Sequence, residues 1–458
     1  MSESPILAGL QHDAGARPVA ARALELVREI LPICRSITGN GVRQTLDILS
    51  REVPLQRFEI ASGTQVFDWE VPPEWNVREA YLIGPDGKRV IDFRRHNLHL
   101  LNYSVPVRAR MPLAQLRPHL YSLPEHPDWI PYRTSYWREQ WGFCLTHRQL
   151  EALPEGEYEV VIDSTLAPGS LTYAECRIRG ELDDEFLIFT HICHPSLAND
   201  NASGMAVAAL LAAAMTGCRP RLSYRFVFAP ATIGSITWLA RNEAAARALR
   251  GGLSVGLLGD SAPLTYKRSR RANTEIDNLA CAAVREIDAA ARVVDFSPYG
   301  YDERQFCSPG FDLPFGRLTR SSNGEYAEYH SSADDLELLD LDALVQSIRA
   351  LARILGRVDL NHRLRNRYPC GEPRLGKRGL FRSTGGKNPL DFEYALLWLL
   401  NQADGTHGAL DIAAASGLPE ALVRQAADTL LQAEMLEYVD GAGIHSLKQD
   451  GRYRRGEK

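Results

Sequence analysis

The segment Thr190-His-Ile-Cys-His-Pro-Ser-Leu-Ala-Asn-Asp-Asn-Ala-Ser-Gly204 decides the fold, because it joins two apolar runs of different length. The short run before it, Phe186–Thr190, predicts a buried strand, and the longer run after it predicts a helix from about Asn201 to Met215. The histidines and the carboxylate therefore lie between the end of a strand and the start of a helix. Functional groups of α/β proteins gather at this position.

The same rhythm continues along the chain. Further strands are predicted near Tyr224–Phe228 and Leu253–Leu258, with helices near 233–249, 274–291 and 340–356. Strands that alternate with helices favour an α/β fold in which a mostly parallel sheet is covered by helices on both faces.

Four polar side chains follow predicted strands. His191 ends one strand and Asp200 lies nine residues later, while Asp260 and His330 each come after a further predicted strand. The carboxyl ends of parallel strands meet at one edge of a sheet, and His and Asp are the ligands that suit a catalytic zinc site. The alternative is that Asp200 caps the helix and His191 is a buried, hydrogen-bonded histidine.

The chain is long enough for two or three domains, since a single core stops growing at roughly 250 to 300 residues. We place a catalytic domain at residues 1–62 and 166–361, an inserted β-rich domain at 63–165, and a winged-helix domain at 385–458. The insertion carries short β-rich runs and five of the seven tryptophans. In the last domain, three helices and a hairpin through Asp440-Gly-Ala-Gly443 follow a Gly- and Pro-rich linker at 362–388.

The bulk composition narrows the function classes. A formal charge of -5 gives no broad electrostatic footprint for nucleic acid. The N-terminus lacks the features of a signal peptide, and no apolar run reaches the ~18 residues needed to span a bilayer, so we expect a cytoplasmic protein without membrane contact. The eight cysteines include no CxxC pair and are expected to be free thiols.

With these features the chain resembles the co-catalytic zinc aminopeptidases, and in particular a bacterial group of aminopeptidase-like proteins with an inserted β domain and a C-terminal winged helix. The resemblance covers nearly the whole chain. Besides the segment quoted above, it is carried by the motifs Ser36-Ile-Thr-Gly-Asn-Gly-Val-Arg43, Pro131-Tyr-Arg-Thr-Ser-Tyr136, Trp141-Gly-Phe-Cys144, Asp302-Glu-Arg-Gln305 and Tyr329-His330.

The resemblance implies a set of metal ligands. In the wider family one Asp bridges two zinc ions and a further Asp and two histidines help to complete the sites, which corresponds here to Asp200, Asp260, His191 and His330. The family's Glu-Glu pair, a general base followed by a metal ligand, falls on Ala231 and Thr232. A hydroxyl is a poor replacement for a carboxylate ligand, so Thr232 favours one zinc ion and leaves two as the alternative.

Ala231 is the main departure from the family. A methyl group cannot accept a proton from the attacking water, a role worth roughly 10²- to 10⁴-fold in rate. Turnover should therefore be poor unless another carboxylate substitutes, and Asp302 and Glu303 are the candidates. The alternative is that both belong to a solvated loop with Arg304 as their partner.

Substrate contacts in the manner of the family fall on Arg43, Arg133 and Tyr329. Arginine can bind a carboxylate through two hydrogen bonds, although both arginines can equally be structural. His194 and Cys193 are expected to support the metal ligands rather than to bind the ion.

The leading hypothesis is a zinc-dependent aminopeptidase or amidohydrolase that releases the N-terminal residue of a small peptide or aminoacyl amide. The alternatives are a catalytically silent metal protein that binds a peptide or amino-acid conjugate, and a winged-helix regulator with a ligand-sensing domain. The third helix of the winged helix, Pro419–Glu434, is net acidic, and only the tail 448–458 is basic, so nucleic acid is an improbable partner. We expect this domain to pack against the catalytic domain or to mediate assembly of a homo-oligomer.

Overall fold

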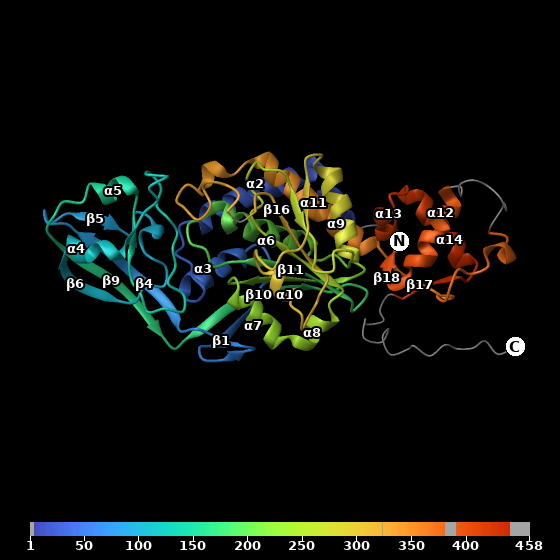
Figure 1. Ribbon diagram of the computed structural model, residues 1–458, viewed down its shortest axis with the longest axis horizontal. Helices are drawn as coiled ribbons and strands as arrows, with labels where there is room; N and C mark the ends of the chain where they lie inside the picture. The colour runs from blue at the N-terminus through green and yellow to red at the C-terminus, as the bar shows by residue number, and fades with distance from the viewer. Residues whose placement is uncertain (1–3, 323, 381–390, 440–458) are drawn as a thin grey trace.

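Figure 1 shows the computed structural model, which describes residues 4–322, 324–380 and 391–439. Three parts follow one another along its longest axis: a β-rich part at one end, a central sheet among helices, and a mostly helical part at the other end. Within the described residues, no helix is both long and apolar enough to cross a membrane. All eight cysteines are free thiols, as predicted.

The central sheet has eight strands in the order β1-β10-β12-β11-β13-β16-β14-β15. Its four middle strands are parallel to one another: β12 (Ser223–Ala229), β11 (Glu185–His191), β13 (Gly251–Val255) and β16 (Phe315–Thr319). Antiparallel pairing connects these to the outer strands β1 (Gln56–Ala61), β10 (Ser170–Ile178), β14 (Thr265–Lys267) and β15 (Arg292–Val294), of which the last two are parallel to each other. The carboxyl ends of the middle strands therefore meet at one edge, as predicted.

Helices cover both faces of this sheet. Alternate residues of β11 enter different cores, with Phe186 and Ile188 in one and Leu187 and Phe189 in the other. The first core is covered by α1 (Pro5–Leu10), α2 (Asp13–Ile30), α3 (Asn40–Leu49), α6 (Gly204–Met215), α9 (Glu275–Ile287) and α11 (Leu341–Leu360). The second is covered by α7 (Ile233–Arg241), α8 (Glu243–Ala248) and α10 (Glu303–Phe306).

The insertion is a four-stranded antiparallel sheet in the order β5 (Arg89–Asp92), β4 (Glu74–Ile83), β9 (Glu157–Ala167) and β6 (Val107–Pro112). Its apolar side chains belong to the same core as the second face of the central sheet, so the insertion packs on the catalytic domain without a break. A small hairpin of β2 (Gln65–Val66) and β3 (Trp69–Glu70) forms a separate two-stranded sheet, and β2 contacts α7.

The last part contains α12 (Asp391–Gln402), α13 (Ala409–Ser416) and α14 (Glu420–Gln432), with a sheet in the order β18 (Asp404–Gly408), β17 (Arg363–Asn366) and β19 (Leu436–Tyr438). Strand β17 lies in the segment 362–388, which was predicted to be a linker. Sequence did not predict this strand, because its partners β18 and β19 are remote in sequence. The winged helix therefore begins well before residue 385. The predicted hairpin at 440–443 and the basic tail at 448–458 lie outside the described residues.

Candidate metal centre

Four side chains converge at the carboxyl edge of the central sheet, with Asp200 in the middle. His191 Nε2 lies 2.9 Å from Asp200 Oδ1, and His330 Nε2 lies 3.1 Å from Asp200 Oδ2. His194 Nδ1 lies 3.7 Å from Asp200 Oδ1. The ligand atoms of His191, His194 and Asp200 all lie within 4.8 Å of one another, which is close enough for one metal ion to bind all three.

The residues on either side of Asp200 bond to the chain that follows β13. The acceptors Asn199 Oδ1, Asn201 Oδ1 and Ser203 Oγ receive the N–H groups of Gly259, Leu257 and Leu258 at 3.0, 3.1 and 3.1 Å. Alternate side chains of this segment thus fix it to the sheet edge. The side chain of Asp200, which lies between them, faces the histidines.

Asp334 holds the backbone of the same segment. Its carboxylate accepts the N–H groups of Asn199 at 2.6 Å and of Asp200 at 3.0 Å, and the Tyr326 hydroxyl at 3.1 Å. Because Asp334 is fully buried, these bonds are shielded from water. Asp334 therefore orients the central ligand through its backbone.

The protonation states fit a metal site. Burial alone would raise the pKa of Asp200, but His194, His191 and His330 hold it well below its usual range, so the carboxylate is charged. Burial lowers the pKa of His194 to about 3, so that ring is neutral, and its buried Nδ1 has no hydrogen-bond partner among the described residues. Neutral imidazole and charged carboxylate are the forms that bind metal ions, and this donor set suits zinc.

Tyrosine rings enclose the histidines. Tyr301 stacks on His191 and Tyr329 stacks on His330, with ring centroids 5.0 and 3.9 Å apart. Tyr132 meets His194 and His330 edge to face at 5.3 and 5.1 Å. These contacts fix the orientation of the imidazoles, and they place Tyr329, a predicted substrate contact, in the wall of the site.

His194 and Asp260 differ from the prediction. His194 was expected only to support the ligands, yet the structure places it among them. Asp260 does follow β13, but it lies outside the group, because its carboxylate accepts Asn199 Nδ2 at 2.7 Å and Ser321 Oγ at 3.0 Å. His330 also lies in a turn rather than directly after a strand.

The two predicted substrate arginines have different surroundings. Arg43 binds Glu74 at 2.7 Å and Glu59 at 3.1 Å, so it joins α3 to β4 and β1, and we assign it a structural role. Arg133 is exposed, with its guanidinium 5.5 Å from the centre of the Tyr121 ring, and it pairs with no carboxylate in the described parts of the chain. It follows Tyr132 in the chain, and its role as a substrate contact stays a prediction.

Asp302 and Glu303 are both fully buried, so the solvated-loop alternative is wrong. Glu303 accepts Lys267 Nζ at 2.9 Å and serves as its buried partner. Asp302 Oδ1 accepts Ser235 Oγ at 2.6 Å, which places Asp302 against the first turn of α7. Its Oδ2 has no hydrogen-bond partner among the described residues, and burial raises the pKa of Asp302 to about 7.

Ala231 precedes Thr232, the N-cap of α7, and is partly buried. Its carbonyl oxygen accepts Cys193 Sγ at 3.8 Å, so it adjoins the segment that carries His191 and His194. Cys193 itself is not in the metal-binding group.

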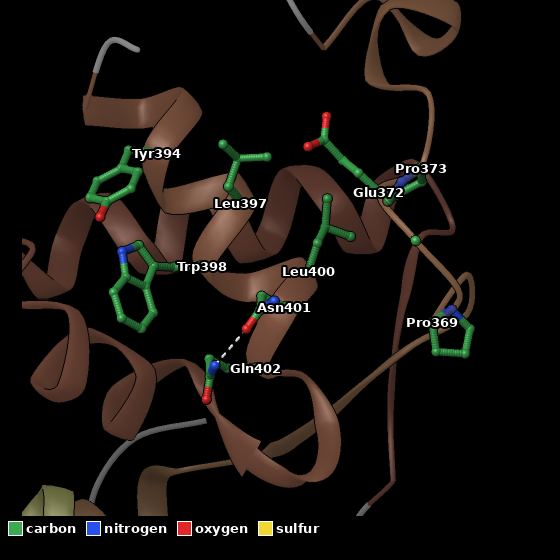
Figure 2. A pocket seen from close by; sticks show the side chains of 10 residues that line it. Pro369, Glu372, Pro373, Tyr394, Leu397, Trp398, Leu400, Asn401 and Gln402 are labelled. Atoms are coloured by element: carbon green, nitrogen blue, oxygen red, sulfur yellow. Dashed lines mark hydrogen bonds between the residues drawn. The ribbon is translucent and has the colours of Figure 1, made fainter. Parts of the chain in front are cut away.

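A cavity of about 540 Å³ lies in the winged helix, away from the metal-binding group. Figure 2 shows Tyr394, Leu397, Trp398 and Leu400 of α12 on one side of it and the 369–373 segment on the other. Among the described residues that line it, Glu372 is the single ionisable acid or base apart from the Tyr394 phenol, so these residues offer no ligand set. The candidate functional site is therefore the metal-binding group at the sheet edge.

The mostly parallel sheet, the metal-binding group at its carboxyl edge and the appended winged helix define an aminopeptidase-like protein. The chain belongs to the family described as "Domain of unknown function (DUF4910)", whose model matches residues 24–361, and a winged helix-turn-helix model matches residues 362–438.

Relatives support the same class. A Clostridium acetobutylicum protein, whose name proposes a polysaccharide biosynthesis protein with an aminopeptidase-like domain, is 46% identical over 415 residues, which is 90% of this chain and 95% of that protein. A crystal structure of a protein from the same organism, provisionally called a peptidase, has a TM-score of 0.80 and 44% identity over 93% of this chain and 98% of its own. The zinc aminopeptidase of Bacillus subtilis shares the fold, with a TM-score of 0.54 and 12% identity over 74% and 95% of the two chains. The predicted fold and family are thus confirmed.

Proposed function

We propose that the chain is a zinc-dependent hydrolase of the aminopeptidase type, which releases the N-terminal residue of a small peptide or aminoacyl amide. One observation carries this proposal: the charged carboxylate of Asp200 lies between His191 on one side and His330, 130 positions later, on the other. The group lies at the carboxyl edge of the strands, where α/β proteins bind their ligands.

His191, His194 and Asp200 Oδ1 would hold the ion. When bound there, zinc would supply Lewis acidity and lower the pKa of a water molecule. Among the described residues, His330 is the one hydrogen-bond partner of the other carboxylate oxygen of Asp200, so a second ion would need a further ligand there. This favours one ion, in agreement with Thr232 in place of a family glutamate.

The protein residues around the group orient the reactants. Asp334 and the tyrosines hold the ligands in place, and Arg133, which follows Tyr132 in the chain, is our candidate for binding a substrate carboxylate. The family's general-base position is occupied by Ala231, which has no carboxylate. The candidate replacement is Asp302, a buried carboxylate beside the start of α7. Its pKa near 7 and its unpartnered Oδ2 suit proton transfer at neutral pH, although less efficiently than a carboxylate at position 231.

A second candidate function is a catalytically silent metal protein that binds a peptide or amino-acid conjugate. Ala231 favours it, because the methyl group removes the proton acceptor and leaves the ligands intact.

Hydrolysis of a panel of aminoacyl amides and dipeptides by the zinc-loaded protein tests the choice. We expect slow turnover by the wild type and a rise of roughly 10²- to 10⁴-fold in kcat for Ala231→Glu. Ala231→Gln, which has nearly the same size but no basic group, is the control and should not show this rise. If neither the wild type nor Ala231→Glu turns over any substrate while zinc is bound, the hydrolase proposal is wrong and the chain is a binding protein.

A further inference from the structure

A polar cavity lies at the edge of the central sheet opposite the metal centre. Its volume is about 480 Å³, which falls within the range of small-molecule sites, roughly 300 to 1,000 Å³. Asp183, just before β11, and Ser223, the first residue of β12, both line it, so it adjoins the amino ends of these parallel strands. Strand β11 has seven residues and ends at His191, and roughly 20 Å therefore separates the cavity from the metal-binding group.

Positive charge dominates the lining of this cavity. Among the described residues that line it, one is acidic, Asp183, and three are basic and exposed: Arg177, Arg179 and Arg219. Arg179 and Arg219 form no hydrogen bond or ion pair with another described residue. Two guanidinium groups are thus available to an anionic ligand.

The third arginine is only partly neutralised. Arg177 Nε lies 2.5 Å from a carboxylate oxygen of Glu185, but the other oxygen of Glu185 lies 2.6 Å from Arg225 Nε. One carboxylate therefore serves two guanidinium groups, and the positive charge at the cavity remains in excess.

The two loops that carry the unpaired arginines are bonded to each other. The N–H group of Glu181 donates to the carbonyl oxygen of Pro220 at 2.9 Å, and the N–H group of Gly180 donates to Ser223 Oγ at 3.1 Å. A Cβ atom at Gly180 would lie 2.2 Å from the carbonyl oxygen of Leu222, so glycine allows this close approach. Both arginines therefore extend from a fixed backbone, and ligand binding costs little in ordering of the loops.

The rest of the lining is polar. The described residues that line the cavity include no aromatic ring and no large aliphatic side chain, so they offer no surface on which a nucleobase could stack. They do include the carboxylate of Asp183, which has no hydrogen bond or ion pair with another described residue, and the hydroxyl of Ser223. Both groups can accept hydrogen bonds from the hydroxyls of a ligand.

We propose that this cavity binds a phosphorylated sugar or a similar polyol phosphate. A phosphate monoester carries roughly two negative charges at neutral pH, which match the two unpaired guanidinium groups, and each arginine can bind phosphate oxygens through two parallel hydrogen bonds. Asp183 then accepts hydrogen bonds from the hydroxyls of the sugar. This ligand is distinct from the substrate of the proposed hydrolase, because the two sites lie at opposite edges of the sheet.

Calorimetric titration of the zinc-loaded full-length protein with glucose 6-phosphate, glucose and inorganic phosphate tests the proposal. We expect glucose 6-phosphate to bind on the order of tenfold more tightly than inorganic phosphate, and glucose not to bind measurably. Arg179→Gln and Arg219→Gln should each weaken the binding of glucose 6-phosphate on the order of tenfold or more. Arg28→Gln is the matched control and should change nothing, because Arg28 of α2 is also exposed and without an ion pair among the described residues.

Asp183→Ala separates recognition of the sugar from recognition of the phosphate. This variant should bind inorganic phosphate at least as tightly as the wild type and should lose the preference for glucose 6-phosphate. Melting temperatures and zinc content establish that each variant is folded and loaded with metal.

Four results would overturn the site. They are no binding of glucose 6-phosphate, equal affinities for glucose 6-phosphate and inorganic phosphate, which would mean an adventitious ion only, unchanged affinities in both arginine variants, and tighter binding of a thymidine oligonucleotide than of glucose 6-phosphate.

Discussion

His330 Nε2 lies 3.1 Å from Asp200 Oδ2, although the two residues are 130 positions apart. His330 has a left-handed backbone with φ 55°, and its carbonyl oxygen accepts the N–H of Tyr132 at 2.7 Å. Tyr132 of the insertion therefore holds His330 in this uncommon backbone conformation. Such conformations are often found at functional sites. The insertion is a part of the site and not only an appendage to the sheet.

The position of His194 predicts that it binds the metal directly. We expect His194→Ala to weaken zinc binding by more than about 100-fold, which is the upper range for residues that only support a ligand. His119→Ala is the control, because His119 stacks on Trp141 in the insertion. Competition with a zinc-sensitive dye measures both, and wild-type affinity in His194→Ala would show that His191, Asp200 and His330 suffice.

Asp334 should influence the metal through Asp200. Asp334→Asn keeps the size of the side chain but weakens its bonds to the N–H groups of Asn199 and Asp200, and zinc affinity should fall by about 10- to 100-fold. The neighbouring Asp335→Asn is the control, since Asp335 caps a surface turn at Glu337. Equal affinities of the two variants for zinc would refute the positioning role.

The winged helix is joined to the catalytic domain by a buried ionic group. Glu275 of α9 accepts Arg250 Nε at 2.8 Å and Arg363 Nη2 of β17 at 3.1 Å. Glu275→Gln removes the charge between two buried arginines, and the free energy of unfolding in urea should fall by about 3–5 kcal/mol. Glu243→Gln, which breaks a surface pair with Arg247, should change it by less than about 1 kcal/mol, and a similar loss in both variants would contradict the prediction.

His407 makes the stability of the winged helix depend on pH. Burial alone would lower its pKa, but Asp404 and Asp411 raise it from 6.5 to about 9. A folded-state pKa above the unfolded value stabilises the protein fully below about pH 6.5, and this contribution is lost as the pH rises through about 9. His407→Gln should therefore lower the melting temperature at about pH 6 and have little effect at about pH 10; the same difference at both pH values would be evidence against it.

The sequence was sufficient for much of the fold. The apolar runs around His191 and Asp200 alternate between the lengths typical of buried strands and helices, and this alternation is what builds the sheet and its carboxyl edge. Strand β17 (Arg363–Asn366) was not predicted, because it is stabilised by pairing with β18 and β19, which lie far along the chain. No local pattern in its four residues indicates that pairing.

The site was predicted less completely, because sequence gives the position of a residue but not the direction of its side chain. Asp260 lies at the predicted edge of the sheet, but its carboxylate accepts hydrogen bonds from Asn199 and Ser321 and does not join the metal-binding group. Arg43 of α3 binds Glu59 and Glu74, which are 16 and 31 residues away and belong to the strands β1 and β4. His194 lies in a loop without regular periodicity, so its approach to Asp200 could be seen only in three dimensions.

Zinc content tests the central claim most directly. Elemental analysis and calorimetric titration are applied to the wild type and to the double variant His191→Ala/His330→Ala, with melting temperatures measured with and without zinc. We expect about one zinc ion per wild-type chain and a melting temperature that rises with added zinc, with both lost in the double variant. A double variant that is folded and still retains stoichiometric zinc would contradict the assignment of the metal centre.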